Sequence, residues 1–322
     1  MITLGRFTFT PPLVVLAPMA GVSDLPFREL CQHSGAHYTV AEMISAKPDL
    51  LDTRLSETRL QFSNDPRYPR IVQLVGGDAG LMAEAAQLMT QRGADIIDIN
   101  MGCPAKVVGK QQAGSALLAN EAQVAAILRA TVAAVKIPVT LKTRLGVDDA
   151  HINIARIGNI AAEAGVQLIA VHGRSRAQKF RGNARFAEIG ALKQALPIPV
   201  LVNGDIGDAA QAQALVRQYG FDGVMIGRAA QGNPWLFTHI RQCFDAAFQP
   251  ELPAPGDVIY RHTCALHQLY GTHGLLIARK HLHCYGQTFR LPRAFRDAVN
   301  AAGNLAAQLD LVSHWFAGAQ YA

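Results

Sequence analysis

Several features are scarce in this sequence of 322 residues, and each shortage excludes a class of protein. No stretch approaches the roughly 18 uncharged apolar residues of a membrane-spanning helix. The start, Met1 to Arg6, lacks the pattern of a secretory signal peptide. The five cysteines form no CxxC pair, and an odd number without metal-ligand spacing suits a reducing compartment. The sequence therefore predicts a cytoplasmic protein with no membrane segment and no metal site.

Acidic residues are absent from three segments that are rich in lysine and arginine. Residues 173–187 and residues 277–296 each hold five basic side chains and no acid, and Lys106 and Lys110 lie in a third such loop. The net charge is +6. A solvated loop or helix surface is the ordinary explanation for any one of these residues. Three such segments together favour a nucleic-acid partner.

Apolar runs alternate with helix-like segments from about residue 13 to residue 240. Most of the runs are continuous, which is typical of parallel strands covered on both faces. The predicted strands are 13–18, 38–43, 70–76, 96–101, 139–145, 168–173, 200–205 and 223–227. Eight β/α units predict an α/β TIM barrel. An open doubly wound sheet is the alternative, although it would usually have fewer strands.

The strand pattern stops at a proline-rich break, residues 250–255. The segment beyond it reads as several helices, around 257–270, 273–286, 293–302 and 304–316. The sequence therefore predicts a barrel domain over residues 1–245 and a small helical domain over residues 256–322.

The segment from Asp98 to Lys106 carries the clearest sign of chemistry. The apolar run that ends at Ile99 reads as a buried strand, and Asn-Met-Gly-Cys-Pro then places Cys103 at its carboxyl-terminal tip. Barrel enzymes keep their reactive groups at this end of the strands. A buried structural cysteine is the common alternative. The flanking Asn, Gly and Pro favour a positioned acid or nucleophile.

The loops after the last two predicted strands contain Asn203-Gly204-Asp205 and Gly227-Arg228. Each glycine alone would suit an ordinary turn. Together, in the loops where barrels often bind phosphate, they predict a phosphate-bearing ligand whose charge Arg228 would neutralise.

Other polar residues lie where strands point into the barrel mouth: Gln73, Asn100, Lys142 and His172. A lysine in an apolar strand is costly unless it meets an anion or a ligand. A hydrogen-bonded structural role is an equally good explanation for His172. Pro18-Met19-Ala20-Gly21 forms an irregular turn with room for a flat ring.

Five motifs resemble the tRNA-dihydrouridine synthases, closest to the bacterial B-type subfamily. They are Ala17–Asp24, Asn100–Pro104, Leu141–Arg144, Val171–Arg174 and Asn203–Asp205, in family order and at family spacing. The sequence departs from the family at Ser23, in place of threonine, and at Cys284, in place of tryptophan. The resemblance implies a TIM barrel that binds FMN and a helical domain that holds tRNA.

The resemblance also implies roles for individual residues. Cys103 would be the catalytic proton donor, and Asn100 would help to seat the uracil. The cofactor would be bound by Pro18, Met19, Ala20, Gln73, Lys142, His172, Asn203, Gly204, Asp205, Gly227 and Arg228. The RNA would be contacted by Arg174, Arg176, Arg279, Lys280, Arg290 and Arg293.

The implied reaction is reduction of specific uridines in the tRNA D-loop to 5,6-dihydrouridine. NADPH, or alternatively NADH, would supply the hydride through FMN. The resemblance implies no metal and no obligate protein partner. Two other functions stay open at this point. One is an FMN enzyme acting on a free pyrimidine, such as a dihydroorotate or dihydropyrimidine dehydrogenase, and the other is a catalytically silent tRNA-binding module.

Overall fold

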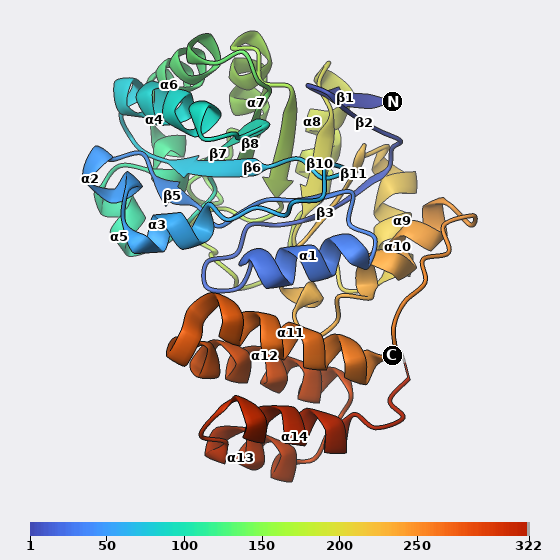
Figure 1. Cartoon of the computed structure of the whole chain (residues 1–322). Coiled ribbons are helices and arrows are strands. Elements are labelled where there is room, and N and C mark those ends of the chain that lie inside the picture. Colours follow the sequence, from blue (N-terminus) through green and yellow to red (C-terminus); the bar gives the residue numbers. More distant parts are fainter. Residues whose placement is uncertain (321–322) are drawn as a thin grey trace.

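Short parallel strands form the centre of the molecule, as seen in the computed structural model, which describes residues 1–320 (Figure 1). Their order in the sheet is β4-β3-β11-β10-β9-β8-β7-β6-β5. The bounds are β3 (Leu13–Leu16), β4 (Tyr38–Thr39), β5 (Ile44–Ser45), β6 (Ile71–Val75), β7 (Ile96–Met101), β8 (Val139–Arg144), β9 (Leu168–His172), β10 (Val200–Asn203) and β11 (Gly223–Ile226). Each of the eight predicted segments therefore contains a strand, although in segment 38–43 only Tyr38–Thr39 is one.

The two ends of this sheet, β4 and β5, belong to one interrupted strand, and this closes the barrel. β4 pairs with β3 in parallel, and β5 pairs with β6 in parallel. Between them, the Ala41 amide donates to the Ile71 carbonyl at 3.3 Å. The predicted TIM barrel is confirmed and the open doubly wound sheet is wrong, because a single chain segment joins the two edges.

Helices surround the barrel and cover its apolar outer face (Figure 1). The longer ones are α1 (Leu25–His33), α4 (Ala79–Gln91), α6 (Glu121–Ala134), α7 (Ile154–Glu163), α8 (Ala187–Ala195), α9 (Ala209–Tyr219) and α10 (Leu236–Phe244). Shorter ones are α2 (Pro48–Leu51), α3 (Arg54–Arg59), α5 (Lys106–Lys110), η1 (Gly114–Ala119) and η2 (Arg228–Ala230). None of the helices in residues 1–320 combines the length and apolar character that a bilayer crossing needs.

An N-terminal hairpin closes the end of the barrel where the strands begin. It consists of β1 (Ile2–Leu4) and β2 (Phe7–Phe9), which pair in antiparallel register. The inward side chains of the hairpin share one buried cluster with residues at the strand starts, such as Leu13 and Ile71. The cavity must therefore open at the other end, where the strands terminate.

The last helices form a separate stack beside the barrel (Figure 1). They are α11 (Pro255–Tyr270), η3 (Gly271–His273), α12 (Gly274–Thr288), α13 (Arg293–Ala301) and α14 (Leu305–Trp315), which confirms the four predicted helices. Residues 245–254 carry no helix or strand. The last two residues of the predicted domain, 321 and 322, lie outside the described residues.

The helical stack packs on the barrel through buried aromatic side chains. Phe27 of α1 lies against His262 and His281, with ring centroids 5.9 and 5.3 Å apart. Trp235, just before α10, meets Phe289 edge to face at 5.6 Å. Phe27 and Trp235 are fully buried, so the helical stack and the barrel share a packed apolar interface.

Candidate active site

A cavity of about 750 Å³ lies where the barrel strands end. Its volume is within the range of small-molecule and cofactor sites. It brings together every predicted catalytic and cofactor residue, with the predicted uracil residue: Pro18, Met19, Ala20, Gln73, Asn100, Cys103, Lys142, His172, Asn203, Gly204, Asp205, Gly227 and Arg228. Among residues 1–320, no three His, Cys, Asp or Glu side chains gather in a way that could hold a metal ion.

Cys103 is half-buried in the cavity wall, on a loop that hydrogen bonds hold from both sides. Its amide donates to Asn100 Oδ1 at 2.9 Å, and its carbonyl accepts from Ser115 Oγ at 2.8 Å. Gly114 has φ +60°, and a Cβ there would lie 2.8 Å from the Cys103 carbonyl oxygen. This position therefore requires glycine, and the tight packing fixes where the thiol projects.

Lys142 projects from β8 into the same cavity and donates from Nζ to Asn203 Oδ1 at 3.2 Å. Burial and the neighbouring Arg144 lower the pKa of Lys142 to about 8, against the opposing effect of Asp98. An ammonium group held in this way gains from an anionic or strongly accepting group placed beside it. Lys142 therefore lines the cavity, and its contact with a ligand stays a prediction.

His172 ends β9 and is buried in the cavity wall. Burial, followed by the cationic neighbours Lys142, Arg144, Arg174 and Arg228, holds the pKa of His172 far below its usual value. The imidazole is therefore neutral at pH 7 and can act only as a hydrogen-bonding group, not as a cation.

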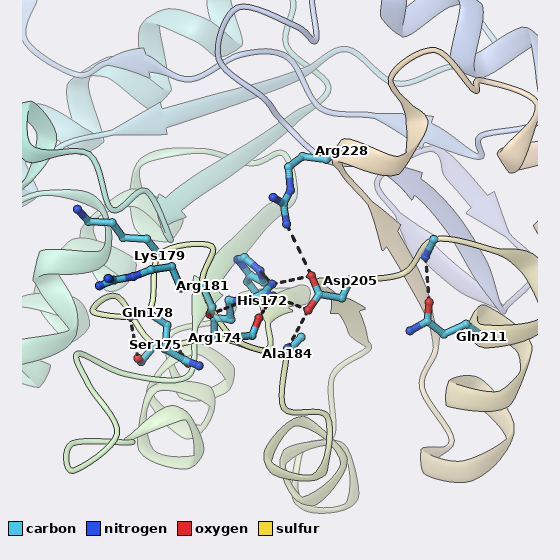
Figure 2. Close-up of polar contacts among 12 residues, drawn as sticks. His172, Arg174, Ser175, Gln178, Lys179, Arg181, Ala184, Asp205, Gln211 and Arg228 are labelled. Carbon is cyan, nitrogen blue, oxygen red and sulfur yellow. Dashed lines mark hydrogen bonds and ion pairs between the residues drawn. The ribbon is translucent and has the colours of Figure 1, made fainter. Parts of the chain in front are cut away.

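Asp205 lies at the centre of a polar cluster on the rim, shown in Figure 2. Its carboxylate accepts from Arg174 Nη1 at 2.8 Å and from the Ala184 amide at 2.9 Å. Arg228 forms a second ion pair with Asp205, with its Nη2 3.6 Å from Asp205 Oδ1. Asp205 itself has φ +48°, and Gly204 before it has φ +115°. The loop after β10 is thus held in an unusual turn by the ion pair with Arg174.

Some of the residues predicted to contact RNA are buried or half-buried, and the others are exposed. Arg174 differs from the expected surface position, because its side chain is buried against Asp205. Arg176 is half-buried, and Arg279 donates to the Ala302 carbonyl at 2.7 Å. The exposed ones are Lys280, Arg290 and Arg293. The basic segment 173–187 reaches the cavity directly, because Lys179 and Phe180 line it.

The cavity residues that sequence reasoning missed include Arg144, Phe180 and Gln231. Arg144 is buried and donates from Nε to the Gly102 carbonyl at 2.7 Å. Phe180 is 54% exposed, and its ring centroid lies 5.6 Å from the guanidinium group of Arg144 and 5.0 Å from that of Arg228. Gln231 lines the mouth. Arg144 could have been predicted from the sequence, because it follows Lys142 by two residues and so faces the same side of the strand.

Known proteins are similar to this chain over nearly its whole length. The model of the dihydrouridine synthase family, Dus, matches residues 15–319. A "tRNA-dihydrouridine synthase B" of Pseudomonas putida is 46% identical over 98% of this chain and 94% of its own length. The proteins of the same name from Pseudomonas aeruginosa and Vibrio cholerae are 44% and 45% identical over 99% and 97% of this chain, and over 97% and 98% of their own lengths.

Proposed function

The chain belongs to the dihydrouridine synthase family, an enzyme family, and from this premise we propose that it reduces uridines of tRNA to 5,6-dihydrouridine. The observation that carries the proposal is the meeting of Cys103, Asn100 and Lys142 in one cavity at the carboxyl ends of the strands. A barrel with this cavity offers an acid, a hydrogen-bonding amide and a cation to one ring-shaped ligand.

FMN fits the residues that line this cavity. The phosphate would lie at Gly204, Gly227 and Arg228, where neither glycine amide has an acceptor among the described residues. A Cβ at Gly204 would stand 2.7 Å from the His172 ring, so this position requires glycine. Without a side chain at Gly204, the phosphate could approach the backbone closely. Gln73 and Lys142 would meet the polar edge of the ring system. Pro18, Met19 and Ala20 would enclose the ring through their backbone, while His172, Asn203 and Asp205 would line the ribityl and phosphate end.

When bound, FMN would supply a hydride to C6 of the uracil after accepting one from NADPH, or alternatively NADH. Cys103 would then donate its thiol proton to C5 as the general acid. Asn100 keeps one amide N–H free of strong partners, with only a 3.6 Å contact to Met43 Sδ, and would donate it to a uracil carbonyl. Arg144 would hold the Cys103 loop through the Gly102 carbonyl.

The two parts of the chain would divide the work. Residues 1–245 would bind FMN and carry out the reduction, and residues 256–322 would grip the tRNA so that an unstacked uridine of the D-loop reaches the cavity. Lys280, Arg290 and Arg293 are exposed and would contact phosphates, as would the rim residue Arg176. Arg174 would act indirectly by holding Asp205, and Arg279 by fixing α12 to the end of α13.

The visible spectrum of the purified protein and a turnover assay test this function together. Bound flavin with NADPH-dependent formation of dihydrouridine in tRNA would support it. A protein without flavin would agree with the silent RNA-binding module. Flavin with turnover of uracil or orotate but not tRNA would support the free-pyrimidine enzyme, although such a substrate would need no basic helical stack.

A further inference from the structure

A chain of hydrogen bonds crosses the cavity wall from a buried carboxylate to the Cys103 loop. Asp98 Oδ2 accepts from Gln73 Nε2 at 2.6 Å, and Gln73 Oε1 accepts from Asn100 Nδ2 at 2.8 Å. Asn100 Oδ1 then accepts from the amides of Gly102 and Cys103 at 3.1 and 2.9 Å. The other oxygen of Asp98 accepts from Thr140 Oγ1 at 2.6 Å.

The register of the strands brings the residues of this hydrogen-bond series next to one another inside the barrel. Asp98 on β7 is paired with Gln73 on β6 and with Thr140 on β8, so the three side chains form one inward-facing layer. Asn100 follows Asp98 by two residues and therefore faces the same side, one layer closer to the mouth. Asp98 is only 3% exposed and does not line the cavity. It can act on a ligand only through its neighbours.

The groups at the two ends of this series of hydrogen bonds determine how the side-chain amides of Gln73 and Asn100 are oriented. A backbone N–H can only donate, so Asn100 must turn its oxygen to Gly102 and Cys103 and its NH₂ group to Gln73. A carboxylate can only accept, so Gln73 must turn its NH₂ group to Asp98 and its oxygen to Asn100. Since neither amide can flip without breaking a bond at one end, the remaining N–H of each amide has a fixed direction.

We propose that Asp98 is a positioning residue that acts through Gln73: by accepting its hydrogen bond, Asp98 fixes the amide so that one N–H of Gln73 is presented to the cofactor. This inference rests on the proposed function, because it takes FMN as the ligand at Gln73. The property that matters is an acceptor at position 98, and its negative charge is dispensable. The same bond also keeps Asn100 oriented toward the Cys103 loop.

Asp98→Asn and Asp98→Leu distinguish the acceptor from the charge. In Asp98→Asn the new carbonyl can still accept from Gln73, because the new NH₂ group can donate to the Thr140 hydroxyl. Asp98→Leu offers no acceptor. The measurement is the dissociation constant of FMN, obtained by flavin fluorescence titration of the full chain after removal of its flavin. We expect Asp98→Asn to stay within about threefold of wild type and Asp98→Leu to be at least about tenfold weaker, the effect of losing one oriented hydrogen bond.

A double-mutant cycle with Gln73→Ala separates positioning from general damage to the fold. If Asp98 acts through Gln73, Asp98→Leu should cost no further FMN affinity once Gln73 is replaced by alanine. Thr143→Val is the matched control, because it also removes a buried polar group from β8 and lies outside the chain of hydrogen bonds. It should leave FMN affinity unchanged.

If Asp98→Leu does not fold, Asp98→Ala provides a second route, because it also removes the acceptor and adds no bulk. Asp98→Ala should weaken FMN binding in wild type and not in the Gln73→Ala background. Weakening by Asp98→Asn as large as that by Asp98→Leu would overturn the proposal, as would a loss of affinity from Asp98→Leu or Asp98→Ala that persists in the Gln73→Ala background. Wild-type protein that binds no FMN would instead overturn the proposed function and this inference with it.

Discussion

Gly232 lies directly against the backbone of Cys284, so that a Cβ on Gly232 would stand 2.3 Å from the Cys284 carbonyl carbon. The contact joins the loop after β11, which lines the cavity, to α12 of the helical stack. Gly232 also has φ +73°, a conformation that other residues adopt only with strain. The cysteine at position 284, where the family resemblance predicts tryptophan, therefore stands at the junction of the two parts of the chain.

Gly232→Ala should destabilise the protein because it adds both a steric clash and backbone strain at this junction. We expect a loss of about 1–3 kcal/mol in the free energy of unfolding, measured by urea denaturation. Gly303→Ala is the control, since a Cβ there meets nothing within 4 Å. Equal stability of the two variants would show that the junction is looser than its geometry implies.

Cys103→Ala should abolish most of the turnover while the flavin site stays intact. Removal of a general acid typically costs about 10²–10⁴-fold in rate. Dihydrouridine formation should fall by this factor, and NADPH oxidation with an artificial electron acceptor should be nearly unchanged. Cys243→Ala, at an exposed cysteine, is the matched control. Wild-type turnover in Cys103→Ala would remove this thiol from the mechanism.

Arg228→Ala should weaken FMN binding and leave riboflavin binding unchanged, because riboflavin lacks the phosphate that the arginine would neutralise. The comparison needs both dissociation constants for wild type and variant. Arg217→Ala, on α9, is a control for loss of an exposed positive charge. If wild type binds riboflavin as tightly as FMN, the phosphate site does not lie at Gly204, Gly227 and Arg228.

Replacement of Lys280, Arg290 and Arg293 by glutamine should weaken tRNA binding and flatten its dependence on salt, because fewer counterions are released from the RNA. Arg279 is left in place, since it holds the Ala302 carbonyl and its loss would disturb the stack. A charge-matched control replaces Arg129, Lys136 and Arg217, which are exposed on the barrel. An unchanged salt slope in the first variant would mean that α12 and α13 do not grip the RNA.

The titration of Lys142 should appear in the stability of the flavin-free protein. Its pKa is lowered to about 8 by burial in the folded state and is about 10.5 for an ordinary lysine. Between these values the unfolded chain binds more protons, so the contribution of Lys142 to stability improves as the pH rises from about 8 to 10.5. Lys142→Met should therefore be more stable than wild type at pH 7, and the difference should shrink toward pH 10.5. A difference that does not vary with pH would contradict the burial of this ammonium group.

The sequence predicted the barrel well because its evidence is local. Continuous apolar runs mark the strands, and the carboxyl ends of parallel strands must converge, so Cys103, Lys142 and Gly204 could be placed together from the order of the residues alone. The hairpin over residues 2–9 was missed because three-residue strands give too short an alternation to recognise. Pairings between distant residues were also missed. The burial of Arg174 on Asp205 and the bond from Gln73 to Asp98 depend on register across strands, which one sequence does not reveal.

Single-turnover reoxidation of the NADPH-reduced enzyme tests the central claim most directly. The reduced enzyme is mixed, without oxygen, with an unmodified tRNA transcript or with free uracil, and the flavin absorbance and the dihydrouridine formed are followed together. The account predicts rapid reoxidation by tRNA, one dihydrouridine formed per flavin reoxidised, and little reaction with uracil. Reoxidation by uracil as fast as by tRNA, or reoxidation by tRNA without dihydrouridine, would contradict it.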